Sequence, residues 1–188
     1  MSTSTSLGSA LRELVRPAVP VSDTEIARLE QHFALLLKWN ARMNLTRITD
    51  PAEAATRHYG ESLFLAARLT PGSVLDIGSG AGFPGIPAAI ARQDCQFHLI
   101  DSNQRKCVFL REAARDLTNV RVSEHRVQDV QEQYDWAVSR AVAMPEILSA
   151  HVSARLALLI GAEDAAALPD FDIVPLPWGD RRVLAIRS

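Results

Sequence analysis

The architecture of the chain can be predicted from residues 74–85, which read Val74-Leu75-Asp76-Ile77-Gly78-Ser79-Gly80-Ala81-Gly82-Phe83-Pro84-Gly85. This stretch passes from a short apolar run into a glycine-rich turn and then into a helical pattern over Pro84–Arg92. Glycines let the backbone turn tightly and let a ligand approach it without meeting side chains. A strand that enters a helix through such a turn is typical of α/β domains that bind a nucleotide-like ligand.

Downstream of this turn, short apolar runs alternate with helical patterns such as Asn103–Leu117. Alternation of this kind predicts a mostly parallel sheet covered on both faces. Only the turn 177–180 separates the last two runs, so we expect them to form an antiparallel hairpin at the sheet edge. The seven predicted strands are Ser73–Ile77, Gln96–Ile100, Val120–Val122, Trp136–Ser139, Leu156–Ile160, Ile173–Leu176 and Val183–Ile186.

The residues before the sheet are predicted to be helical. Ser22 and Glu25 form a capping box, and apolar residues then recur every three or four positions, which predicts a helix over 23–43. A second helical stretch, Ala54–Leu69, is interrupted near Gly60. We therefore divide the chain into a flexible N-terminal segment (1–20) and a single domain (21–188). In that domain a helical extension (21–70) precedes the sheet (71–188).

Composition excludes several classes of protein. The chain has 188 residues, 47% of them hydrophobic, and a net charge of -2, so nucleic-acid binding would require a local basic patch. The Ser- and Thr-rich first ten residues lack the features of a secretory signal, and no run approaches the roughly 18 apolar residues of a membrane span. The two cysteines and five histidines show no metal-ligand spacing. These features predict a cytoplasmic protein that binds neither metal nor membrane.

An acid follows the glycine-rich turn at an informative distance. The second predicted strand ends at Asp101, 23 residues after Gly78. An acid about 20 residues beyond such a turn can accept hydrogen bonds from both hydroxyls of a ribose. A glycine-rich turn without a ligand would not explain this acid, so we expect a cofactor that contains adenosine.

Two kinds of cofactor fit this pattern. Gly80, Gly82 and Gly85 formally match GxGxxG, which would suit the dinucleotide of an oxidoreductase. Asp76 argues against that cofactor, because a carboxylate at the end of the first strand would face an anionic pyrophosphate. S-adenosylmethionine instead brings an ammonium and a sulfonium, which a nearby carboxylate attracts. Pro84 also removes an amide donor that a phosphate would use. The stretch therefore favours S-adenosylmethionine and a Rossmann-like class I methyltransferase fold.

Several motifs carry a more specific resemblance. The chain resembles the glucose-inhibited division protein B family, bacterial methyltransferases that modify N-7 of a guanine in small-subunit (16S) ribosomal RNA. The similarity covers roughly residues 25 to 145. Besides the glycine-rich turn it rests on Lys38-Trp39-Asn40, Asn44-Leu45-Thr46, Arg57-His58 with Ser62, Asp101-Ser102, Arg105-Lys106, Phe109-Leu110-Arg111 and Ser139-Arg140-Ala141.

The resemblance implies cofactor contacts at Gly78, Phe83, Val127, Gln128 and Arg140, with Asp101 at the ribose. It also implies small-subunit ribosomal RNA, or the assembled small subunit, as the partner, and we expect the protein to be a monomer. Combined with the glycine-rich turn, the candidate cofactor residues are Asp76, Gly78, Ser79, Gly80, Gly82, Phe83, Asp101, Ser102, Val127, Gln128 and Arg140.

The expected chemistry needs no general base, because N-7 of guanine carries a lone pair and no proton. Arg140, at the end of the fourth predicted strand, is the candidate catalytic residue, since ligands of open α/β sheets bind at that edge. Trp178 is open to a role in base stacking. The candidate RNA-binding residues are Arg105, Lys106, Arg181 and Arg182.

The chain also departs from the family. It reads Leu159-Ile160-Gly161-Ala162 where the family usually has a Lys-Gly pair, the region after that looks shortened, and Glu61 replaces an aspartate. These departures leave two alternatives open: a small-molecule methyltransferase of the same fold, and a cofactor-binding assembly factor that does not catalyse.

Overall fold

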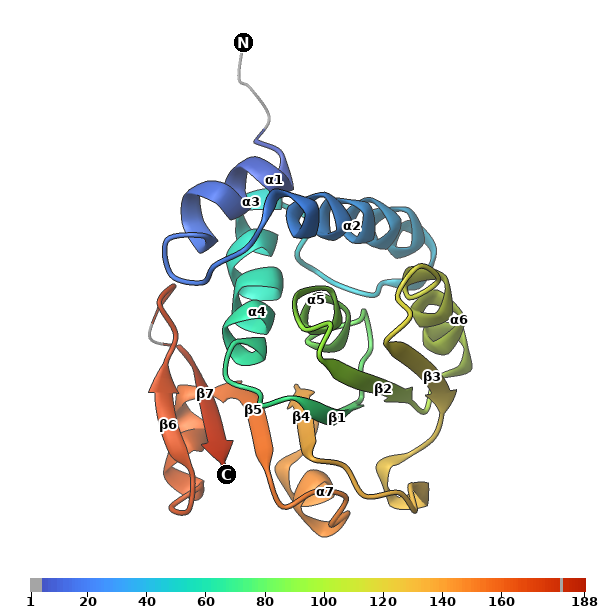
Figure 1. Ribbon diagram of the computed structural model, residues 1–188, viewed down its shortest axis with the longest axis vertical. Helices are drawn as coiled ribbons and strands as arrows, with labels where there is room; N and C mark the ends of the chain where they lie inside the picture. Colours follow the sequence, from blue (N-terminus) through green and yellow to red (C-terminus); the bar gives the residue numbers. More distant parts are fainter. Residues whose placement is uncertain (1–4, 180) are drawn as a thin grey trace.

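Seven strands form one sheet: β1 (Gly72–Ile77), β2 (Cys95–Asp101), β3 (Val120–Glu124), β4 (Trp136–Arg140), β5 (Leu156–Gly161), β6 (Asp172–Pro175) and β7 (Arg182–Arg187). The structure is a computed structural model that describes residues 5–179 and 181–188. The strand order is β3-β2-β1-β4-β5-β7-β6 (Figure 1). β1 to β5 pair in parallel, and β7 runs antiparallel to both β5 and β6. The predicted strands and the hairpin at the edge are confirmed; Asp180, in the predicted turn, lies outside the described residues.

Successive side chains of the central strands enter two different cores. In β1, Val74 packs into the larger core, whereas Leu75 and Ile77 pack into the smaller one. β5 alternates in the same way: Ala157 faces the larger core and Leu158 the smaller. This period of two is the geometry of a strand, and burial on both faces explains why these runs are almost wholly apolar.

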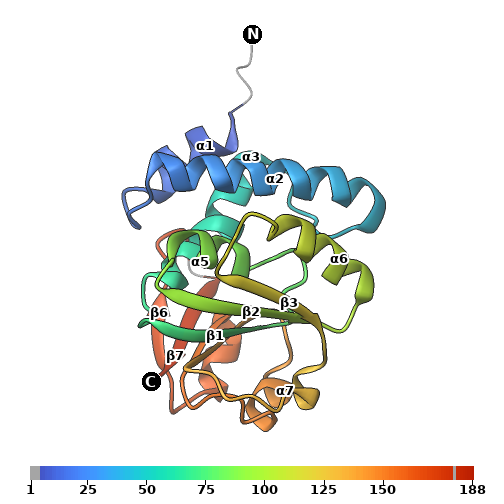
Figure 2. The same cartoon turned by 45° about the vertical axis from the view of Figure 1, so that its right-hand side comes forward.

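Helices cover the two faces unequally. α4 (Glu61–Ala66), α5 (Gly85–Ala91) and α6 (Gln104–Ala113) lie on the face of the larger core. α7 (Met144–Ser149) lies on the opposite face, where Ile147 enters the smaller core (Figures 1 and 2). Short 3-10 turns complete that face, η3 (Val127–Asp129) and η4 (Ala162–Ala167).

The helical extension forms a further layer above α4 to α6 (Figure 2). It comprises α1 (Leu7–Ala10), the π-helical turn η1 (Leu11–Val15), α2 (Asp23–Met43), α3 (Pro51–Ala54) and the π-helical turn η2 (Ala55–Gly60). The predicted bounds of α2 are confirmed, because Ser22 and Glu25 form both hydrogen bonds of the capping box. Within the described residues, no helix combines the length and the apolar composition that crossing a bilayer would require.

The structure differs from two expectations, one about the N-terminal segment 1–20 and one about the helical extension. Leu7, Leu11 and Val15 are buried in the larger core, so residues 7–15 are an ordered helical segment rather than a flexible one; residues 1–4 lie outside the described residues. The helix also continues through Gly60 instead of being interrupted there. A Cβ at Gly60 would lie 3.0 Å from the Trp178 ring, so the glycine admits that side chain against the helix.

Candidate functional site

The glycine-rich turn connects β1 to α5 at the carboxyl edge of the sheet. Gly78 has a φ of +68°, and a Cβ there would lie 2.5 Å from Cγ2 of Val142, so no other residue fits without a shift. Ser79 N donates to Ile100 O at 3.0 Å, and Ser139 Oγ donates to Ile77 O at 2.8 Å. These bonds fix the turn to β2 and β4, where the ends of three strands meet.

Asp101 is held in place by the same turn. Its Oδ2 accepts a hydrogen bond from Gly80 N at 3.0 Å, and its Oδ1 accepts one from Asn103 N at 2.9 Å. Lys106 Nζ lies 3.8 Å from Oδ2. Each carboxylate oxygen has two lone pairs, so the fixed carboxylate can still accept hydrogen bonds from a ligand.

A cavity of about 310 Å³ opens at this edge, which is large enough for a small ligand. Four of the predicted cofactor residues line it, Gly78, Asp101, Ser102 and Val127, together with Lys106, which was predicted to bind RNA. Gln128 lies next to it and donates to Glu146 Oε1 at 3.4 Å. The remaining lining residues were not predicted: Ile77, Ile100, His125, Arg126, Ala141, Val142 and Glu146. Most of them follow the ends of β3 and β4. Ligands of open α/β sheets bind at the carboxyl ends of the strands, so this position in the sequence could have identified them.

Asp76 does not reach this cavity. Its side chain is fully buried beneath the turn, where Oδ2 accepts a hydrogen bond from Gly85 N at 3.0 Å. Oδ1 has no hydrogen-bond partner within the described residues. Burial raises the pKa of Asp76 to about 7. In this conformation Asp76 supports the turn from below, and its contact with the charged end of a cofactor stays a prediction.

Ser79, Gly80, Gly82 and Phe83 also lie outside the cavity lining. Ser79 and Phe83 are buried, and the Gly80 amide is committed to Asp101. Gly82 has a φ of +89°. The Phe83 ring stacks on His58 with 4.5 Å between centroids. Gly80 and Phe83 therefore hold Asp101 and His58 in position, and the residues that line the cavity lie at or after the ends of the strands.

Arg140 points away from the cavity and toward the helical extension. It donates from Nη1 to Arg57 O and from Nη2 to Nδ1 of His58, both at 2.8 Å. Its guanidinium also lies 5.6 Å from the Phe83 ring centroid. Desolvation lowers the pKa of Arg140 to about 10, so the group stays charged at neutral pH. The structure thus places Arg140 beside the glycine-rich turn rather than among the residues that line the cavity.

His58 connects Arg140 to a second hydrogen-bonded group. Its Nε2 lies 2.8 Å from Thr46 Oγ1, and Asn40 exchanges two hydrogen bonds with the backbone of Thr46. Ser62 Oγ donates to His58 O at 2.6 Å. Burial, reinforced by the charge of Arg140, lowers the pKa of His58 to about 3, so the imidazole is neutral. Three motifs of the helical extension and the distant Arg140 therefore meet in one network.

The predicted RNA-binding residues separate into two groups. Arg105 and Arg181 are exposed. Arg182 is half-buried: it pairs with the buried carboxylate of Glu61 at 3.0 Å and donates to Leu159 O. Trp178 is also half-buried: Nε1 donates to Leu14 O at 2.7 Å, and the ring packs against Phe64. Both side chains are held by residues distant in the sequence, and their contact with RNA stays a prediction.

A second cavity, of about 520 Å³, lies beside the first at the ends of β4 and β5. Ala141 and Val142 line both cavities, so they form a common wall. Glu163 and Asp164 contribute carboxylates to the second cavity. The arrangement can hold two ligands on either side of one short loop. Across the part of the chain that the structure describes, no group of three His, Cys, Asp or Glu side chains is placed to hold a metal ion.

The chain is similar to known methyltransferases in sequence and in structure. Residues 25–157 match the family model GidB, described as rRNA small subunit methyltransferase G. The chain is 40% identical over 134 residues to ribosomal RNA small subunit methyltransferase G of Nitrosomonas europaea, covering 68% of this chain and 63% of the relative. The chain is 42% identical over 120 residues to the protein of the same name from Xanthomonas euvesicatoria pv. vesicatoria, and the match covers 62% of this chain and 57% of that relative. The chain thus spans less than two thirds of the length of these relatives.

Solved structures agree on the fold. A putative RNA methyltransferase from Pyrococcus horikoshii superposes with a TM-score of 0.53 at 14% identity, covering 85% of this chain and 96% of that one. M. jannaschii TYW2 in complex with AdoMet superposes with a TM-score of 0.52 at 15% identity, covering 67% of this chain and 71% of that one. The sheet is therefore that of a class I methyltransferase, and the match over most of the sequence shows that the chain belongs to the GidB family.

Proposed function

We propose that the protein is an S-adenosylmethionine-dependent methyltransferase that modifies N-7 of a guanine in small-subunit ribosomal RNA. The observation that carries this proposal is the pair of cavities that share the wall formed by Ala141 and Val142. A methyl donor in one cavity and an acceptor base in the other would meet at this wall. Family membership supports a methyl donor of this kind and small-subunit ribosomal RNA as the class of acceptor.

The residues of the first cavity fit the proposed cofactor. Asp101 keeps acceptor capacity for the two ribose hydroxyls, and Val127 offers a buried apolar surface for adenine. Gly78 lets the cofactor approach the backbone, because no Cβ stands between them. When bound, S-adenosylmethionine supplies an electrophilic methyl group on a sulfonium. The lining carries charges of both signs, the carboxylates of Asp101 and Glu146 and the cations of Lys106 and Arg126.

The contribution of the protein to the reaction is to position the reactants. N-7 of guanine attacks with its own lone pair, so the site needs no group to remove a proton. The chain has to hold the base in line with the methyl group and exclude water, which lowers the barrier by reducing the entropic cost of the encounter. Arg140 points away from the first cavity and uses two of its five N–H donors on Arg57 and His58; we propose that its other donors reach the ligand or guanine O-6 once the substrate is bound.

The test is transfer of a labelled methyl group to small subunits that lack the modification and to their naked RNA. Label at a single guanine N-7 is the expected result, and the preferred substrate tells whether the assembled subunit or the free RNA is recognised. We propose further that the protein acts as a monomer in the cytoplasm, where this substrate is made. If S-adenosylhomocysteine binds but neither RNA is labelled, the ribosomal assignment fails and a small-molecule acceptor or a non-catalytic role replaces it.

A further inference from the structure

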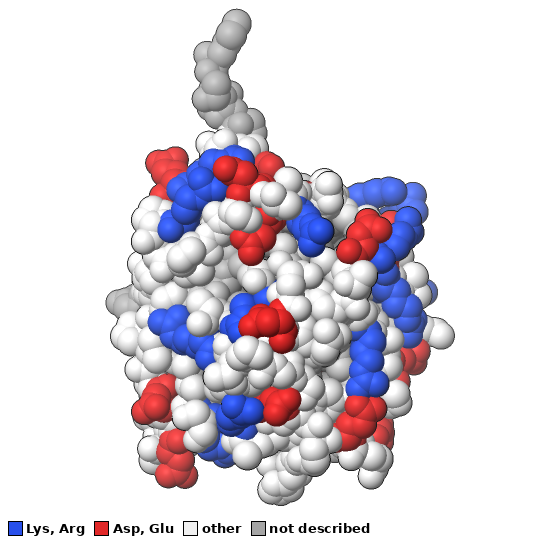
Figure 3. Space-filling model, in the orientation of Figure 1, with Lys and Arg blue, Asp and Glu red and all other residues white. Residues whose placement is uncertain are grey.

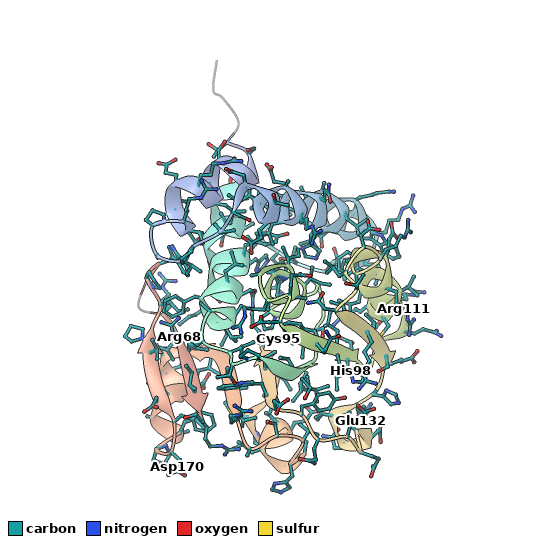
Figure 4. All side chains as sticks on the ribbon, in the orientation of Figure 1. Arg68, Cys95, His98, Arg111, Glu132 and Asp170 are labelled. Atoms are coloured by element: carbon teal, nitrogen blue, oxygen red, sulfur yellow. The ribbon has the colours of Figure 1, made fainter. Side chains whose placement is uncertain are left out.

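A basic groove lies between the C-terminal end of α2 and the first turns of α6. It has a volume of about 430 Å³ and is lined by Lys38, Trp39, Arg42, Met43, Arg105 and Val108. Of the described residues that line it, three are cationic and none is acidic. Figure 3 shows Lys and Arg side chains along the right-hand edge of this face, where α6 and the end of α2 lie in Figure 1, with acidic side chains at its margins. Arg111 lies at the outer edge of α6 (Figure 4) and is exposed.

The floor of the groove is apolar and rigid. Trp39 is fixed on two sides: Nε1 donates to Glu112 Oε2 at 3.1 Å, and the ring packs edge-on against Phe109 with 5.9 Å between centroids. Val108 adds an apolar side chain that is 47% exposed. A fixed aromatic ring among cations is the combination with which proteins bind single-stranded nucleic acid: bases contact the apolar surface while phosphates pair with the cations.

The groove adjoins the cofactor cavity. Arg105 lines the groove, and the next residue, Lys106, lines the cavity. The amides of both residues donate to Oδ1 of Asn103, which fixes the first turn of α6 between the two sites. A strand bound in the groove therefore has its next nucleotides beside the edge of the sheet where methyl transfer is proposed.

We propose that this groove binds a single-stranded segment of the RNA substrate flanking the target guanine. Phosphates of that segment pair with Lys38, Arg42 and Arg105, and a base packs over Trp39 and Val108. This inference rests on the proposed function for the nature of the substrate, but it adds a binding site on the helical extension, outside the two cavities of the sheet. It also gives that extension a role in the choice of substrate.

The first experiment reverses charge on one side of the groove. The variant Lys38→Glu/Arg42→Glu is compared with Arg28→Glu/Arg115→Glu, which makes the same change in net charge at exposed positions outside the groove. Arg28 lies 14 residues before Arg42 on α2, or about 21 Å along the helix axis. The KM for RNA is expected to rise at least tenfold more in the groove variant, with kcat and the affinity for S-adenosylhomocysteine unchanged. Equal effects of the two variants would overturn the proposal.

Direct binding separates this proposal from the proposed function. Fluorescence anisotropy with a single-stranded RNA oligonucleotide needs no turnover, and loss of two phosphate contacts should lower the salt dependence of binding by about 1.4 in log–log slope. Ultraviolet cross-linking of the same RNA should label peptides that contain residues 38–43 or 104–111. If RNA binds but these peptides are not cross-linked, the proposal that the groove binds RNA is overturned. A chain that binds RNA in the groove but transfers no methyl group contradicts the proposed function instead. If the groove variant fails only on assembled subunits, the groove contacts a ribosomal protein and the RNA proposal is overturned.

Discussion

The guanidinium of Arg140 donates a hydrogen bond to Nδ1 of His58, with 2.8 Å between the two nitrogens and 82 positions between them in the sequence. A guanidinium has no acceptor, so Nδ1 must carry a lone pair, and the proton of the neutral ring lies on Nε2. Nε2 then donates to Thr46 Oγ1. The end of β4 is thereby attached to the helical extension, and both are attached to Phe83 of the glycine-rich turn.

Arg140→Ala is expected to lower methyl transfer by at least about 100-fold, because small misplacements of reacting groups have effects of this size. It should also destabilise the fold by about 1–3 kcal/mol, since His58 Nδ1 and Arg57 O lose a buried donor. Single-turnover rates at saturating cofactor, with circular dichroism as the check on folding, measure both effects. An unchanged rate would remove Arg140 from the mechanism.

His58→Asn and His58→Gln form a matched pair for the same network. Asparagine places an oxygen near the position of Nδ1 and can still accept from Arg140, whereas glutamine reaches the position of Nε2 and Thr46 instead. If His58 positions Arg140, the asparagine variant keeps at least ten times more activity than the glutamine variant at similar stability. Equal losses in the two variants would show that His58 serves only to stabilise the fold.

Buried histidines should make the protein sensitive to acid. Desolvation lowers the pKa of His32 to about 4, of His58 to about 3 and of His98 (labelled in Figure 4) to about 4, from 6.5. Above pH 6.5 both folded and unfolded chains hold these rings neutral, so their contribution to stability is fully present. As the pH falls below 6.5 toward the pKa values of the folded chain, only the unfolded chain takes up protons on these rings. Each ring then reduces the free energy of unfolding by about 1.4 kcal/mol per pH unit. Denaturant titrations at pH 7.5, 6 and 5 measure this loss, and a constant free energy would contradict it.

Local sequence signals predicted most of the fold. The bounds of α2 are correct because the capping box and the apolar repeat act within the helix itself. The central strands are correct because burial on both faces makes each one a short apolar run. The edge strands β3 and β6 have no fully buried residue, and their shorter apolar runs were enough to predict them. Asp101 and Gly78 could be assigned to the site because the turn and the strand end lie at the same edge of a parallel sheet.

The differences between expectation and structure concern contacts that no local pattern encodes. Arg182 was expected to meet RNA, but its partner Glu61 lies 121 positions earlier in the sequence. Asp76 was expected to face a cofactor, yet the α5 amide of Gly85 folds over it. Polar composition suggested that the first residues are flexible, whereas Leu7 and Leu11 find a core only in the folded chain. In each case tertiary packing changes the environment of a residue whose local sequence indicates exposure.

The ion pair of Glu61 and Arg182 is expected to stabilise the packing of β7 against α4. Side-chain exposure is 5% for Glu61 and 23% for Arg182, so either residue alone would leave a poorly solvated charge. Glu61→Gln or Arg182→Met should each lower the free energy of unfolding by about 2–4 kcal/mol, and the double variant should recover part of that loss. Glu53→Gln, which breaks the exposed pair with Arg57, is the control and should cost less than about 1 kcal/mol. Additive losses in the double variant would show that the two side chains are not coupled.

Asp76 should make the free energy of unfolding depend on pH in the direction opposite to that of the buried histidines. Burial raises its pKa from 3.8 to about 7, so the folded chain holds this proton after the unfolded chain has released it. Its contribution to stability is fully present below about pH 4 and declines by about 1.4 kcal/mol per pH unit as the pH rises toward 7. Asp76→Asn keeps an oxygen that can accept from Gly85 N and has no charge to bury.

The stability of Asp76→Asn relative to the original chain should therefore increase between pH 5 and 7.5, measured by urea unfolding at each pH. A constant difference would show that Asp76 does not titrate in this range.

The same variant decides whether this carboxylate supports the turn or contacts the cofactor. Because the side chain lies beneath the turn, we expect the affinity for S-adenosylhomocysteine to change less than threefold. A loss of tenfold or more would mean that the turn opens when the cofactor binds and that Asp76 then reaches the ammonium group.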